Sequence, residues 1–144
     1  MSSNRKTARE ALATLLSTAL TGGGGLAQAV YSYRVGDFGG ASPVVIVSSQ
    51  GSRRERSTFQ GSRNTVFLQV DIFVLYAAVG WTEQDAETRL DDIEAAIAGV
   101  VDANQETANW LALNWADRSQ RVDVAIGGVD YIRELLVLAA EVWG

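Results

Sequence analysis

The amino-acid sequence predicts an α+β fold, in which a mostly antiparallel sheet of about four strands packs against two helices, with long inter-strand loops. Two segments carry apolar residues at helical spacing, one near the N-terminus and one after residue 82. Elsewhere apolar residues alternate with other residues, as they do in strands. With 144 residues, of which 47% are hydrophobic and 20% charged, the chain is most naturally one domain, residues 1–144.

The first helix is predicted from about Asn4 to Thr21. Its alanines and leucines follow the spacing of one buried stripe, and its bases lie on the opposite side. Gly22–Gly25 is predicted to end this helix, because glycine readily takes the left-handed conformation after a helix C-terminus. A phosphate-binding loop would follow a strand and end in Gly-Lys-Ser/Thr, so we interpret these glycines as a helix exit.

Two strands are predicted next, at Ala29–Val35 and Pro43–Ser49, joined by the loop Gly36–Ser42. Pro43 suits the start of a strand, because proline cannot donate a hydrogen bond to the ladder. The segment Gln50–Ser62 is polar and contains glycine and arginine. We predict that it is a long connection between antiparallel strands.

The third strand, Asn64–Ala78 (NTVFLQVDIFVLYAA), is the most informative segment of the chain. Its one face is an unbroken apolar row at period two, made of Val66, Leu68, Val70, Ile72 and Val74. The other face is mixed, with Phe67, Gln69 and Asp71 among its residues. Strands usually have about 5–6 residues, so this long, partly polar strand is typical of a sheet that serves as a building surface.

The second helix is predicted from Thr82 to about Ala103, with Thr82 as its cap and Asp85 completing a capping box. Gly99 lies inside this helix, where glycine costs about 1 kcal/mol relative to alanine. We attribute Gly99 to a close approach of the helix to the sheet.

The C-terminal segment is predicted to be a β-hairpin. Val122–Ile126 alternates, and Gly127-Gly128 then supplies a two-residue turn before a strand that begins at Val129. Tyr131–Trp143 also fits a helical spacing, and the hairpin signal decides in favour of the strand. The four tryptophans, Trp81, Trp110, Trp115 and Trp143, are interpreted as core or interface anchors.

Composition makes several function classes improbable. The chain has no cysteine and no histidine, which removes disulfides, thiolate metal sites and the commonest general base. A net charge of −5 argues against DNA binding through overall basicity. There is no apolar run of about 18–20 residues and no signal-peptide core, so we expect no membrane association. We also expect the protein to stay in the cytoplasm unless a larger particle carries it out. We expect no cofactor and no metal.

Charge is placed unevenly along the chain. Arginines crowd one predicted loop, at Arg53, Arg54, Arg56 and Arg63. Arginine is favoured where carboxylates are bound at interfaces, which favours docking onto an acidic partner. The alternatives are contact with nucleic-acid phosphates and a loop that is simply solvated.

The second predicted helix is acidic. Between Glu83 and Glu106 the sequence has Glu83, Asp85, Glu87, Asp91, Asp92, Glu94, Asp102 and Glu106 against the single base Arg89. A metal site needs converging carboxylates, whereas those of residues 91, 92 and 94 diverge around a helix. We interpret them as a solvated face. Glu83, Glu87, Asp91 and Glu94 are predicted to form an acidic ridge along the outside of the helix.

The order of these elements resembles the tail terminator proteins of long-tailed phages. The similar segments are REALATLLSTAL, PVVIVSS, VFLQVDIFVLYAAVGWTEQDAETRLDDIEAAIAGVV and RVDVAIGGVDYIRELLVLAAEVW. The resemblance covers most of the chain and depends on layout and patterning, and the segment Asn104–Asp117 is extra to it.

This resemblance implies a virion protein that forms a hexameric ring on the head-proximal end of the tail tube. Its partners are further copies of itself, the major tail tube protein and a head-side connector, with DNA as passing cargo. A ring needs a head-to-tail interface that closes. From charge placement, we expect the acidic ridge (Glu83, Glu87, Asp91, Glu94) to line the lumen. The arginines 53, 54, 56 and 63, with Asp37 and Phe38 of the Gly36–Ser42 loop, are expected at partner interfaces.

Three alternative functions remain open from the sequence. The nearest is another neck component, a head–tail adaptor or tail-completion ring. The second is a small carboxylate-dependent enzyme centred on Asp71, Glu94 or Asp123, which would need a deep pocket with raised carboxylate pKa values. The third is an interaction domain with no role in a virion.

Overall fold

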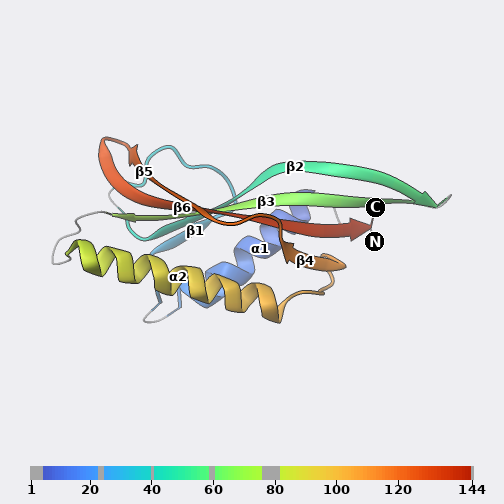
Figure 1. The fold of residues 1–144 in the computed structure, drawn as a ribbon, viewed down its shortest axis with the longest axis horizontal. Coiled ribbons are helices and arrows are strands. Elements are labelled where there is room, and N and C mark those ends of the chain that lie inside the picture. Colours follow the sequence, from blue (N-terminus) through green and yellow to red (C-terminus); the bar gives the residue numbers. More distant parts are fainter. Residues whose placement is uncertain (1–4, 23–24, 40, 59–60, 76–81, 144) are drawn as a thin grey trace.

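The computed structural model describes residues 5–22, 25–39, 41–58, 61–75 and 82–143, except for the side chains of residues 55–58, 61–63 and 143. Two helices lie against one side of a single sheet (Figure 1). The elements are α1 (Arg5–Leu20), β1 (Ala29–Tyr31), β2 (Val44–Thr58), β3 (Gly61–Leu75), α2 (Glu83–Ala103), β4 (Ala112–Trp115), β5 (Gln120–Ile126) and β6 (Val129–Trp143).

The sheet has six strands within the described residues, in the order β1-β2-β3-β6-β4, and β5 also pairs with β6. The β1–β2 pair is parallel and the other pairs are antiparallel. One side of β6 pairs with β3, while its other side is shared by β5 near the start and β4 near the end. The α+β prediction is confirmed, but about four strands was too few; β4, in the segment 104–117, was not predicted.

The core lies between the helices and the sheet side that we call the inner face. The predicted apolar row of β3 is confirmed, since Val66, Leu68, Val70, Ile72 and Val74 are at most 2% exposed. The helices cover this row with residues at helical spacing. These are Ala8, Leu12, Leu16 and Leu20 from α1 and Ala86, Leu90, Ile93, Ile97 and Val101 from α2.

The predicted capping box at the start of α2 is present, but the explanation given for Gly99 is wrong. The Asp85 backbone N–H donates to Thr82 Oγ1 at 3.2 Å, and the Thr82 N–H donates to Asp85 Oδ2 at 2.8 Å, which completes the capping box. A Cβ added to Gly99 would meet nothing within 4 Å, because Gly99 lies on the exposed side of α2. The expected close approach to the sheet was therefore wrong.

The segment Gln50–Ser62 is not the predicted loop. In its described part, β2 and β3 continue as a paired two-stranded arm, with Arg53 opposite Thr65 and Arg54 opposite Asn64. Figure 1 shows this arm extending beyond the helices. A strand without a packed layer beneath it needs no apolar alternation, so the polar composition favoured a loop.

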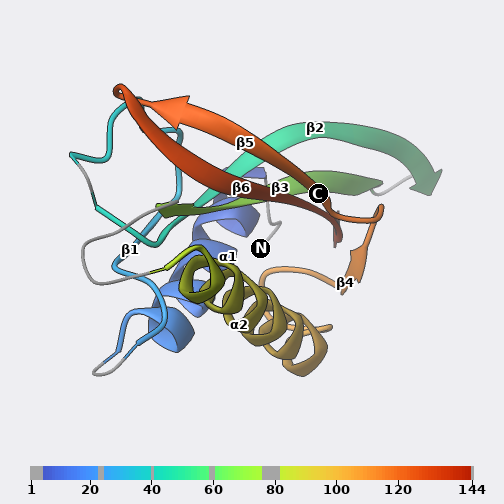
Figure 2. The ribbon, with the colours of Figure 1, turned by 60° about the vertical axis from the view of Figure 1, so that its left-hand side comes forward.

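A smaller cluster covers one end of the opposite side of the sheet, the outer face. It contains Phe38, Val44, Ile46, Phe73 and Tyr131. The first strand ends at Tyr31 rather than Val35, because the chain then turns across the outer face to bring Phe38 onto it. In Figure 2 this segment lies near the β5–β6 turn.

The predicted C-terminal hairpin is confirmed, and the helical alternative for Tyr131–Trp143 is wrong. Gly127 and Gly128 have φ values of 59° and 79°, the left-handed conformation that the two-residue turn requires. Pairing on both sides holds β6 in the sheet despite its good helix formers. No helix within the described ranges is long and apolar enough to cross a membrane.

Candidate interaction surfaces

The start of α1 and the inner face of the arm border an open hollow of about 580 Å³, which we call the basic hollow. Arg5, Lys6, Arg9, Ser52 and Arg54 line it. Ser52 and Arg54 pair with inner-face positions of β3, so they face the same side as the helices. Four cationic side chains from two distant parts of the sequence therefore meet at one place.

None of the described residues that line the basic hollow is acidic. No ion pair within the described residues engages any of its four bases. Arg9 Nε is buried and has no hydrogen-bond partner there, and the same is true of Oδ1 of Asn64, the cross-strand partner of Arg54. The positive end of the α1 dipole adds to this charge. The hollow is therefore suited to an anionic group from outside the chain.

Of the predicted arginine cluster, Arg54 lines the basic hollow, whereas Arg53 pairs with Thr65 on the opposite face of the arm. Arg53 and Arg54 lie exposed on the arm. Arg56 and Arg63 lie in β2 and β3, and their side chains fall outside the described set. The sequence interpretation missed the contribution of α1, because its bases were assigned to a solvated helix side. Three bases within its first two turns were the available signal.

The predicted acidic ridge of α2 has different environments along its length. Glu83 and Asp91 are exposed, in agreement with the prediction. Glu87 accepts two hydrogen bonds from the guanidinium of Arg121 in β5. These bonds lower the pKa of Glu87, and burial opposes this effect. Glu87 is thus held by its own chain.

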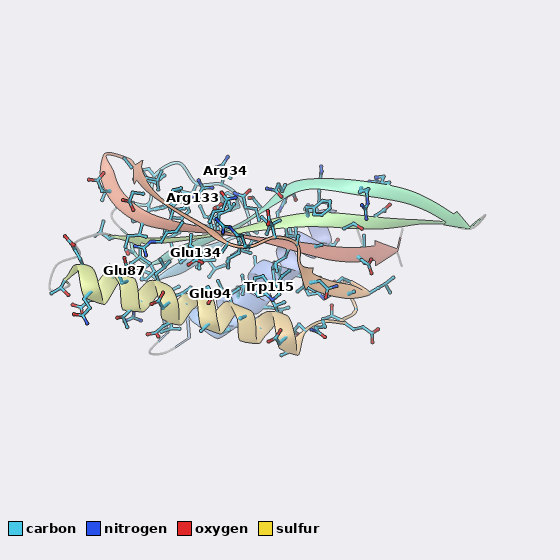
Figure 3. All side chains as sticks on the ribbon, in the orientation of Figure 1. Arg34, Glu87, Glu94, Trp115, Arg133 and Glu134 are labelled. Carbon is cyan, nitrogen blue, oxygen red and sulfur yellow. The ribbon has the colours of Figure 1, made fainter. Side chains whose placement is uncertain are left out.

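Glu94 is partly buried, and a second carboxylate, that of Glu134, lies near it on the sheet. Glu134 pairs with Ile72 on the inner face and interrupts the apolar positions of β6. Figure 3 shows Glu94 and Glu134 between α2 and β6. Burial raises the pKa of Glu94, and the charges of Glu134 and Asp91 raise it further. The ridge is therefore not a uniform outer surface.

An ion pair occupies the middle of the outer face. Asp71 is 1% exposed, its Oδ1 accepts a hydrogen bond from Arg133 Nε at 2.9 Å, and Arg133 Nη2 forms a salt bridge with the same oxygen at 2.9 Å. Its Oδ2 accepts a hydrogen bond from Gln69 Nε2 at 2.9 Å. The Arg133 guanidinium also lies 5.9 Å from the ring centre of Phe73. Asp71 is thus fully engaged within the sheet.

The three carboxylates considered for an enzyme lie on separate elements. Asp71 is on the outer face of β3, Glu94 is on α2, and Asp123 is exposed on β5. Among the described residues, no three acidic side chains converge as a metal site would require. Glu94 has the raised pKa that the enzyme interpretation called for, but its close neighbour is another acid rather than either of the other two candidates.

Asp37 and Phe38 have contrasting positions in the segment that crosses the outer face. Asp37 is exposed, and its Oδ1 accepts a hydrogen bond from the Gly39 N–H at 2.8 Å. Phe38 is 8% exposed and makes edge contacts with Phe73 and Tyr131 at centroid distances of 5.0 and 5.4 Å. Phe38 therefore anchors the segment in its own core and offers little surface to a partner.

Both sides of the sheet end in strands with open edges. β1 pairs with β2 at Val44–Ile46, and no described strand pairs with the same edge of β2 beyond Ile46. On the other side, β5 pairs with β6 and with no further described strand. Exposed apolar side chains lie near these edges. They include Trp115 at the end of β4, which is 39% exposed, whereas Trp110 is buried.

By these features the protein is an α+β structure of two layers, with an extended hairpin arm and with basic and acidic side chains on separate surfaces. No protein-family model matches the sequence, and no curated protein matches it. The fold is similar to a chain in a solved structure described as "Virion of native gene transfer agent (GTA) particle", with a TM-score of 0.49 and 16% identity. The similarity covers 92% of this chain and 84% of that chain.

Proposed function

We propose that this protein is a structural virion subunit that forms a ring on the head-proximal end of a phage tail tube. In that position it would end tube polymerisation and present a surface to the head-side connector. The supporting observation is that the sheet has two open edges and that an arm extends beyond the helices. Long open edges are rare in isolated subunits, because they pair readily with another chain.

The two edges are suited to a ring because they differ from each other. The β2 edge and the β5 edge lie on opposite sides of the sheet. A contact between unlike surfaces of identical copies is head-to-tail, and it closes into a ring when the rotation between copies permits. Strand addition at such an edge supplies main-chain hydrogen bonds. Arg53 and Arg54 on the arm would limit uncontrolled pairing, since charged residues discourage edge-to-edge aggregation.

The proposal is tested by negative-stain microscopy of tail tubes mixed with the purified protein. We expect a ring with six-fold symmetry at the head-proximal end and tubes that no longer elongate. Decoration of a preformed head or neck would favour the adaptor alternative. Elongation that continues at the same rate in the presence of the protein would contradict the capping function.

A charge-reversed variant tests the arm in the same assay. Arg53, Arg54 and Arg56 changed together to Glu should abolish capping, because we propose that the arm contacts the tube or the neighbouring subunit. Arg118→Glu is the matched control, since Arg118 is exposed in the connection between β4 and β5. If the triple variant caps tubes as well as the control does, the arm has no part in this function.

A further inference from the structure

The basic hollow and α2 carry opposite charges in the same chain. Arg5, Lys6, Arg9 and Arg54 line the hollow. The side of α2 away from the sheet carries exposed residues at helical spacing, and we call it the outward side. It consists of Asp91, Asp92, Ala95, Gly99 and Asp102. The adjacent carboxylates of Asp91 and Asp92 provide the charge that the hollow lacks.

We propose that the basic hollow of one copy binds the outward side of α2 in the next copy. This inference rests on the ring-forming function proposed above and names the contact that would close the ring. The hollow lies between α1 and the arm, whereas Asp91 and Asp92 lie on another element, so the contact joins unlike surfaces. Such a contact is head-to-tail, as a ring requires.

The shapes of the two surfaces support the same pairing. The arm extends beyond its own helices, so a helix from another copy can continue the helical layer beneath it (Figure 1). On the outward side, Ala95 and Gly99 follow the two aspartates and leave space for close approach. A Cβ at Gly99 would meet nothing within 4 Å in the single chain, so contacts within the chain do not require glycine at this position.

Arginine suits this role better than a role in nucleic-acid stacking. A guanidinium presents planar donors that match a carboxylate, and three of the four bases in the hollow are arginines. None of the residues that line the hollow is aromatic. Single-stranded nucleic acid is bound largely by stacking on aromatic side chains. An acidic protein surface is therefore the occupant that these residues favour.

Cysteine pairing gives a direct test, because the chain has no native cysteine. Ser52→Cys places a thiol in the hollow, and Ala95→Cys places one on the outward side without changing any charge. The two variants are mixed at about 1 mM, which captures even contacts with a millimolar Kd, and treated with a mild oxidant. We expect a disulfide-linked dimer in the mixture, at roughly tenfold higher yield than in a mixture of Ser52→Cys with the control Ser119→Cys. Equal yields in the two mixtures would overturn the proposal.

Charge exchange tests whether electrostatics drive the contact. In the Ser52→Cys variant, Arg9 and Arg54 are changed to Glu; in the Ala95→Cys variant, Asp91 and Asp92 are changed to Arg. Each reversal combined with an unreversed partner should lower the yield roughly tenfold, because like charges then meet. Combining both reversals should restore it. No restoration, with circular dichroism showing both variants folded, would overturn the proposal.

Two further measurements separate this inference from its alternatives. A fluorescent single-stranded DNA oligonucleotide should not compete for the hollow; if it suppresses the dimer and its binding is lost in Arg9→Glu/Arg54→Glu, the hollow is a nucleic-acid site and the inference fails. Tube capping without the mixture-specific dimer would leave the proposed function intact and remove this contact. Formation of the mixture-specific dimer without tube capping would support this contact and contradict the proposed function.

Discussion

Asp71 shows how a single buried charge depends on its partner. The carboxylate is almost fully enclosed, yet Arg133 and Gln69 satisfy both of its oxygens. A buried charge without a partner is strongly destabilising, because its desolvation is no longer offset. The pair thus links β3 to β6 on a face that is otherwise only partly apolar.

Replacing Arg133 with Met should therefore destabilise the fold. The change keeps much of the side-chain volume and leaves Asp71 unpaired, so we expect a loss of about 3–5 kcal/mol in the free energy of unfolding. Urea denaturation followed by circular dichroism measures it. The control Arg118→Met, at an exposed site, should change stability by less than about 0.5 kcal/mol. A loss below about 1 kcal/mol for Arg133→Met would contradict the importance of the pair.

The burial of Glu94, together with the charges of Glu134 and Asp91, predicts an unusual dependence of stability on pH. The pKa of Glu94 in the folded chain is raised above its ordinary value of 4.5, so the folded state holds its proton more tightly than the unfolded state. Its contribution to stability is fully present below the unfolded pKa and is lost as the pH rises through the folded pKa. The contribution of Glu87 depends on pH in the opposite direction. Because Arg121 lowers the pKa of Glu87, this contribution to stability is lost on acidification.

Glu94→Gln should remove the loss of folding stability that occurs as the pH rises above 4.5. The variant should be more stable than the parent at pH 7, and the difference should shrink toward pH 4. Urea unfolding across this pH range measures the change. Glu83→Gln, on an exposed part of the same helix, is the control. An identical pH profile for Glu94→Gln and the parent would contradict the raised pKa of Glu94 in the folded chain.

Within α2, the capped N-terminus stabilises the helix, whereas the glycine at position 99 destabilises it relative to alanine. Its N-terminus has a complete capping box, whereas Gly99 contributes flexibility and no packing. Alanine at an exposed interior position of a helix is favoured over glycine by about 1 kcal/mol. The proposed close approach of a neighbouring copy would account for a glycine at this position.

Gly99→Ala should raise the free energy of unfolding of the free protein by about 0.5–1 kcal/mol. Thr82→Ala should lower it by about 1 kcal/mol, because the first turn loses its cap. Thermal unfolding of both variants, with Thr88→Ala as an exposed control on the same helix, measures these shifts. Destabilisation by Gly99→Ala would mean that the glycine serves the fold of the single chain.

The arm and the C-terminal hairpin show why the sequence signal was uneven among the strands. In β3 one face is buried against the helices, so apolar residues alternate and the strand is evident from sequence. In the arm that constraint is absent, and arginine, serine and glycine occupy paired positions. For β6 the composition fits a helix, and the preceding Gly127-Gly128 turn was the decisive local signal.

At the scale of the whole molecule, the segregation of charge governs association. The chain has a net charge of −5, yet it gathers four bases around one hollow while α2 is strongly acidic. Copies of such a molecule repel one another at long range and attract where the basic hollow meets the outward side of α2. Salt screens contacts between exposed charges, with a Debye length of about 10 Å at 0.1 M and about 3 Å at 1 M.

Self-association should therefore weaken as salt is raised. Sedimentation at about 50 mM and about 500 mM NaCl should show a larger associated fraction at the lower concentration, since the Debye length shortens between them. The Arg9→Glu/Arg54→Glu variant should lose this difference, whereas Arg118→Glu should keep it. Association that strengthens with salt would indicate an apolar interface instead, such as one formed around Trp115 and Leu111.

The elements whose patterns reflect local chemistry could be predicted from the amino-acid sequence alone. The inner row of β3, the capping box of α2 and the glycine turn before β6 each follow from spacing within a short segment. Which charges lie near one another depends on the fold, because folding brings α1 to the arm and Glu94 near Glu134 across long stretches of chain. Periodicity records which side of an element is buried. It carries no record of which distant element covers that side, so the basic hollow becomes evident only in the folded chain.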